Sequence, residues 1–155
     1  PQMSASLILP TVEKSLFEQR LITALGYAGT LPMLACLLAM ESSWALPLLT
    51  VYSLAIIAFL SGNWWTTALM HRNISARQRQ SILLFSNAIV ITAVVSVGFM
   101  GTKALLVLAL LFGLLLLGER LLAIFRPQPN YYRNMRTGVT TLVIALHLSA
   151  FLLSP

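Results

Sequence analysis

Long apolar stretches without a single charge alternate with short charged segments along this chain of 155 residues. The charge-free runs cover residues 21–40, 42–71, 80–102, 104–118 and 137–155. A helix needs about 20 apolar residues to cross the hydrocarbon layer of a bilayer. The run that ends at residue 118 is short, but it continues beyond a charged pair through apolar residues 121–125. The pattern therefore predicts five transmembrane helices.

The expected fold is all-α, a polytopic integral membrane protein with a single five-helix transmembrane domain over residues 16–155, preceded by a polar N-terminal segment of residues 1–15. We expect the first helix to begin at a capping box formed by Ser15 and Glu18, and to bend at Pro32. The predicted helices cover about residues 16–40, 44–70, 81–100, 103–125 and 131–153.

The basic residues are distributed unevenly between the two ends of these helices. Lys14 and Arg20 precede the first span, three arginines lie between the second and third, and three more lie between the fourth and fifth. The other ends carry Lys103 and no arginine. Because Lys and Arg gather on the cytoplasmic side of short loops, the expected N-terminus is inside and the C-terminus outside. In a mitochondrial membrane the inside would be the matrix side.

Composition supports this class and limits the partners. Hydrophobic residues make up 58% of the chain and charged residues 9%, whereas a soluble domain carries roughly 25% charged residues. The net charge of +6 does not indicate nucleic-acid binding, because the basic residues are separated by spans and form no basic-aromatic surface. The expected partners are membrane lipids and either another membrane protein or further copies of this chain.

Glu119 and Arg120 are the charged residues that intrude into a predicted span. One interpretation makes Glu119 an interhelical partner for an arginine, with Arg79, Arg133 and Arg136 as candidates. The alternative makes it a proton or ion site. Arg120 is close enough to the helix end for its side chain to extend to the interface.

His147 falls near the middle of the last predicted helix. We favour a neutral histidine bonded to a Thr or Ser of a neighbouring helix over a proton relay or a cofactor contact. No cofactor and no metal site is predicted. The chain has no Asp, no paired carboxylates and no metal-ligand spacing, so we do not expect an enzyme.

The segment Phe59–Leu69 is the most distinctive local feature, with Asn63, Trp64 and Trp65 at its centre. Trp44 and the tryptophan pair are about 30 Å apart along a helix, which suggests that they mark the two membrane faces. The segment is interpreted as an interfacial aromatic anchor, with Ala58 and Gly62 as a small-xxx-small contact for another helix. The alternative is a headgroup, quinone or partner site in which Asn63 and the indole nitrogens donate.

Three segments resemble an uncharacterised family of small five-helix membrane proteins, which includes bacterial inner-membrane proteins and a mitochondrial transmembrane protein. They are Leu25–Pro32, which is similar to an LG-x-AG-x-x-P pattern, Phe59–Leu69, which is similar to F-x-G-G-x-H-W-G, and the tyrosine- and arginine-rich Tyr132–Thr140. Trp64 occupies the usual histidine position and Thr66 a usual glycine position. The resemblance implies the five-helix fold and the membrane location, for which a bacterial inner (cytoplasmic) membrane is favoured over the mitochondrial inner membrane. It implies no activity.

The expected function is that of an accessory, scaffold or assembly subunit that works by helix–helix contact in a larger membrane complex. Small residues in the first two spans and the Leu-rich fourth span suit lateral packing. The alternative is a small carrier, channel or lipid- or quinone-binding protein. The residues expected to contact a partner or lipid are Asn63, Trp64, Trp65, Glu119, Arg120, Arg133, Arg136 and His147.

Overall fold

The computed structural model describes residues 5–71 and 73–154, with side chains from residue 15 onward. Every element within these residues is helical. The α-helices are α1 (Ala5–Ala28), α2 (Leu31–Leu38), α3 (Ala45–Met70), α4 (Ala76–Phe99), α5 (Ala104–Leu121) and α6 (Asn130–Leu153). Two short 3₁₀ turns, η1 (Gly101–Lys103) and η2 (Ala123–Phe125), lie on either side of α5.

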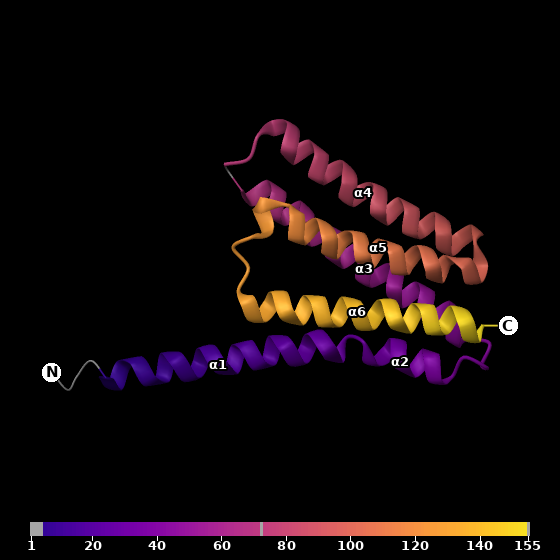
Figure 1. The fold of residues 1–155 in the computed structure, drawn as a ribbon, viewed down its shortest axis with the longest axis horizontal. Helices are drawn as coiled ribbons and strands as arrows, with labels where there is room; N and C mark the ends of the chain where they lie inside the picture. The colour runs from indigo at the N-terminus through magenta and orange to yellow at the C-terminus, as the bar shows by residue number, and fades with distance from the viewer. Residues whose placement is uncertain (1–4, 72, 155) are drawn as a thin grey trace.

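Five helical segments of the described chain are long and apolar enough to cross a membrane, which agrees with the predicted number. They are Ser15–Leu38, Ala45–Met70, Ala76–Phe99, Gly101–Leu121 and Asn130–Leu153. α3 packs against α4 and α5, α5 packs against α6, and α1 packs chiefly against α6. The links α3–α4 and α5–α6 lie at the same end of the bundle, beyond which the N-terminal part of α1 extends (Figure 1). We call this the basic end, because Arg79, Arg126 and Arg136 lie in or next to these links.

The first span differs from the prediction at its start. The part of the expected polar segment that lies within the described residues is helical, because α1 begins at Ala5. Ser15 is thus inside the helix and caps nothing, although its hydroxyl accepts a weak hydrogen bond of 3.4 Å from the Gln19 amide. The Ser15–Glu18 pattern was wrong as a start signal because the residues before it continue the helix.

The expected bend near Pro32 is a complete break between α1 and α2 at residues 29–30. Pro32 sits in the first turn of α2, where its missing N–H is tolerated. The break leaves the Gly29 carbonyl free to accept a hydrogen bond of 2.9 Å from the Tyr52 hydroxyl of α3. A buried backbone group needs such a partner, so this contact fixes the break against the neighbouring helix.

α4 begins at Ala76, five residues before the predicted position of 81. Ser75 is its N-cap, since the Ser75 hydroxyl accepts a hydrogen bond of 3.2 Å from the Gln78 backbone N–H. The Arg79 side chain reaches back to α3 and donates to the carbonyls of Ala68 and His71, each at 3.2 Å. A basic side chain that binds the last carbonyls of a helix stabilises that terminus. This link is therefore structured by its own polar residues.

The predicted fourth helix, 103–125, ends earlier than expected. α5 stops at Leu121, because Leu122 is extended with ψ 123°, and η2 follows. At the other end, α4 and α5 are joined through Gly101, which has a positive φ of 53° that other residues rarely adopt. The last helix agrees with the prediction of 131–153 to within one residue.

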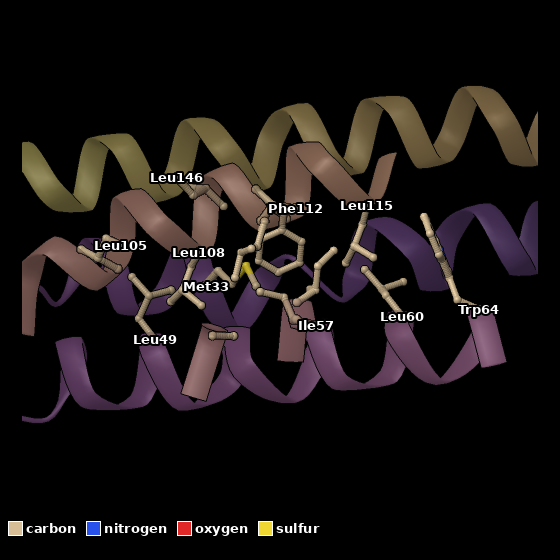
Figure 2. Close-up of a cluster of buried hydrophobic side chains, with 14 of the residues drawn as sticks. Met33, Leu49, Ile57, Leu60, Trp64, Leu105, Leu108, Phe112, Leu115 and Leu146 are labelled. Atoms are coloured by element: carbon tan, nitrogen blue, oxygen red, sulfur yellow. The ribbon is translucent and has the colours of Figure 1, made fainter. Parts of the chain in front are cut away.

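The core is a continuous strip of apolar side chains between α2, α3, α4, α5 and α6. Figure 2 shows that it runs along the bundle from Leu105 and Leu49 to Trp64. Trp64 closes the strip at the basic end. Large side chains such as these dominate packing energetics, so this strip holds the position of the polar residues described next.

Candidate functional site

An ion pair joins α5 to α6 near the basic end. The Arg136 guanidinium donates to both carboxylate oxygens of Glu119, from Nε to Oε2 at 3.1 Å and from the terminal nitrogen to Oε1 at 2.6 Å. Both side chains are only 9% exposed. This two-point geometry is the strong form of a carboxylate–arginine bond. The interhelical pairing of Glu119 is confirmed, and Arg136 is the partner among the three candidate arginines.

Arg120, the next residue, reaches α6 at a different point. Its guanidinium donates to the Arg133 backbone carbonyl and to the Thr137 hydroxyl. The Arg133 side chain itself is exposed. Glu119 and Arg120 therefore bind the same turn of α6, residues 133–137, through different groups. They do not pair with each other, which follows from the ~100° between adjacent side chains on a helix.

Trp64 lies in the core, which differs from its interpretation as an interfacial anchor. It is 1% exposed, and its ring centroid lies 5.4 Å from that of Phe85 and 5.0 Å from that of Phe125. Gly118 of α5 makes room for it, since a Cβ at this position would lie 2.2 Å from Cη2 of the indole. The physical reason for the difference is this glycine slot, which lets α5 approach α3 closely enough to cover the ring.

The neighbours of Trp64 in sequence face outward. Asn63 and Trp65 are both exposed, and so is Trp44 at the start of α3. The Trp64 indole nitrogen and the Ser61 hydroxyl are buried without a hydrogen-bond partner in the described part of the chain. A partner or lipid can therefore contact Asn63 and Trp65. It cannot reach most of the Trp64 side chain, which is buried.

His147 is fully buried in the C-terminal half of α6 and belongs to a separate polar contact. Its Nδ1 lies 2.8 Å from the Val143 carbonyl, which can only accept, so we assign the proton to Nδ1. Its Nε2 lies 2.9 Å from the Ser53 hydroxyl of α3, whose oxygen is also 2.7 Å from the Leu49 carbonyl of its own helix. The predicted bond to a Ser or Thr of a neighbouring helix is confirmed. No sequence signal identified Ser53 itself, because its partner is 94 positions away.

Replacing Ser53 with Ala should leave Nε2 of His147 buried without a partner. An orphaned buried polar group costs about 1–3 kcal/mol, and we expect a loss of this size in the free energy of unfolding in mild detergent, measured by circular dichroism. Ser96 is the matched control, because it is also buried but donates only to the Ala93 carbonyl of its own helix. An equal loss in S53A and S96A would contradict the role of Ser53.

The structure brings Trp64, Glu119, Arg120 and Arg136 together at the basic end and leaves His147 in the bundle centre. Within the described residues no three His, Cys, Asp or Glu side chains are grouped in a way that could hold a metal ion. Cys36 is buried as a free thiol. The polar residues that the sequence singled out within the spans are thus mainly engaged in holding helices together, and Asn63, Trp65 and Arg133 remain available to a partner.

Comparison with known proteins gives a family and no activity. The model of a family described as "Protein of unknown function (DUF3429)" matches residues 19–152 of the chain. No curated protein and no solved structure shows a significant match. With five apolar helices, the match indicates a membrane protein and leaves its role to be argued from the residues.

Proposed function

The chain belongs to the DUF3429 family of proteins of unknown function, and we propose that it acts as an accessory, scaffold or assembly subunit of a larger membrane complex. In this proposal the membrane is the inner membrane of a bacterial cell. The basic end faces the cytoplasm, because Lys and Arg gather on that side. The part of the chain that contacts the partner is an outward face of α3.

This face of α3 is formed by small residues that no other helix covers within the described part of the chain. Ala55, Ala58, Gly62 and Thr66 are exposed and recur at three- and four-residue spacing, so they lie along one side of the helix. A Cβ built on Gly62 would meet nothing within 4 Å. We call these four residues the small-residue face of α3. Transmembrane helices associate through small residues because the backbones can then approach closely.

Asn63 borders this face and supplies a polar contact. Its side chain is exposed and forms no hydrogen bond within the described chain. It lies seven residues before the end of α3, about 10 Å along the helix axis, which places it within reach of the hydrocarbon region. Side-chain amides in this environment bind across helix pairs. The uncovered small-residue face beside this amide is the observation that carries the proposal, and its occupant is a transmembrane helix of another membrane protein.

The test compares two glycine variants that add the same bulk to outward positions. Gly62→Leu should abolish stoichiometric co-purification of a partner from mild detergent at native expression. Gly98→Leu on α4 is the matched control, because a Cβ at Gly98 also meets nothing within 4 Å. Because an added Cβ at either glycine meets no described atom within 4 Å, we expect both variants to be recovered in wild-type amounts.

Mass spectrometry of the purified complexes separates the outcomes. A partner that is present with wild type and G98L and lost with G62L supports the proposal. A monomer without any stoichiometric partner would overturn it, and so would a partner retained equally by G62L. A complex made only of further copies of this chain would replace the accessory role by a homo-oligomer.

A further inference from the structure

A cavity of about 450 Å³ lies between α1 and the start of α6. All the residues that line it belong to these two helices. The open sides of the cavity therefore face the surroundings of the bundle. Both polar and apolar side chains contribute to it, namely Leu16, Gln19, Arg20, Thr23, Ala24, Tyr27 and Tyr131. Their spacing on α1 follows one side of the helix, so the cavity runs lengthwise along α1.

Tyr27 forms the inner wall of this cavity. A Cβ on Gly138 of α6 would lie 2.2 Å from the Tyr27 hydroxyl oxygen, so the tyrosine rests directly on the glycine backbone. From Arg20 to Tyr27 the cavity extends over seven residues, about 10 Å of helix. This length accommodates several methylene groups of an extended hydrocarbon chain next to Ala24.

Arg20 has no partner within the described chain, in contrast to three of the other arginines at the basic end. Arg136 is bound to Glu119, Arg120 to α6, and Arg79 to the end of α3. Arg20 is exposed, and its side chain lines the cavity without a hydrogen bond or ion pair to a described residue. The cavity thus combines an uncompensated positive charge with neighbouring amide and hydroxyl donors and an apolar wall.

We propose that this cavity binds one anionic phospholipid, with the headgroup phosphate at Arg20, Gln19 and Tyr131 and an acyl chain beside Ala24 and Tyr27. Basic pockets between transmembrane helices are suited to acidic headgroups. The apolar wall selects a lipid over a soluble phosphate, because a free anion would leave that wall unoccupied. This site is on a different helix from the small-residue face of α3 and does not depend on the proposed accessory role.

The test measures dissociation constants of the purified full chain for phosphatidylglycerol, phosphatidylcholine and soluble glycerol phosphate by native mass spectrometry. Arg20→Gln should weaken phosphatidylglycerol binding about five-fold, which corresponds to about 1 kcal/mol for one arginine near the headgroups. Arg77→Gln is the matched control, because Arg77 is also exposed and does not line this cavity. It removes the same charge and should leave the affinity unchanged.

A second variant tests the apolar half of the cavity. Ala24→Trp narrows the space beside Tyr27 and keeps Arg20, so it should also weaken phosphatidylglycerol binding. Equal weakening by R20Q and R77Q would overturn the proposal, since it would show only the overall charge of the surface. Unchanged binding in R20Q, or glycerol phosphate competing as well as the lipid, would overturn it too. Circular dichroism of each variant confirms that the fold is retained.

Discussion

Replacing Glu119 with Gln is expected to lower the free energy of unfolding by about 3–5 kcal/mol. Breaking a buried ion pair by removing one partner has a cost of this size, because the remaining charge is left uncompensated. Arg136 is buried with its guanidinium bound at two points to Glu119. A guanidinium stays charged in proteins, so E119Q leaves it without a counter-charge between α5 and α6. Unfolding in detergent with increasing dodecyl sulfate, followed by circular dichroism, measures the loss.

The control for this prediction is Arg133→Gln, which removes an exposed arginine side chain one turn earlier on α6. It should change stability by no more than a surface substitution does, within about 0.5 kcal/mol. The double variant E119Q/R136Q should lose clearly less than the sum of the two single variants, because groups in contact are coupled. Additive losses would contradict the pairing. Normal stability of E119Q together with a loss of proton or ion transport would favour the alternative interpretation of Glu119.

Charge patterning was enough to predict the spans and the ion pair. An apolar run long enough to cross a bilayer has few options other than a helix, and a carboxylate such as Glu119 inside it needs a partner. The choice of Arg136 over Arg79 and Arg133 could not be made from the sequence. It depends on the relative register of α5 and α6, and Arg79 turned out to be occupied by the carbonyls at the end of α3.

Helix starts were less predictable because the same local signal occurs twice. Ser15 and Glu18 match a capping box, and so do Ser75 and Gln78. In the structure the second motif begins a helix, whereas the first lies within α1, which starts ten residues earlier at Ala5. A capping-box motif is compatible with a helix start but does not require one. Whether the preceding residues continue the helix depends on their own neighbours, which the motif does not contain.

The position of Trp64 was not predictable for a related reason. Tryptophan is enriched at membrane interfaces on average, and Trp65 follows this tendency with an exposed side chain. The adjacent Trp64 faces the other way into a slot at Gly118, 54 positions along the chain. The sequence around a glycine in a Leu-rich helix does not indicate which side chain packs against that glycine.

Gly118→Ala is expected to destabilise the protein by about 1–3 kcal/mol, the usual cost of overpacking a core. The new Cβ would lie 2.2 Å from Cη2 and 2.8 Å from Cζ2 of Trp64. Phe85 and Phe125 flank the indole, so a shift of the ring also disturbs its contacts with these side chains. Gly113→Ala is the matched control on the same helix, since its Cβ would meet only Ile144 Cδ1 at an ordinary 3.7 Å. Because Ala is the better helix former, by about 0.5–1 kcal/mol, G113A should be neutral or stabilising.

We attribute the expected destabilisation by G118A to the clash with the Trp64 ring. A second substitution, at Trp64, tests this cause. Trp64→Phe removes the part of the indole that carries Cη2 and Cζ2, so it should lose core packing in the wild-type background. In the G118A background the same change removes the overlap, and the alanine methyl fills part of the vacated space. We therefore expect W64F to be less harmful, or even stabilising, when Gly118 is already Ala. Losses that simply add in the double variant would show that the slot at Gly118 does not hold Trp64, and that α3 and α5 are kept together by the remainder of the strip.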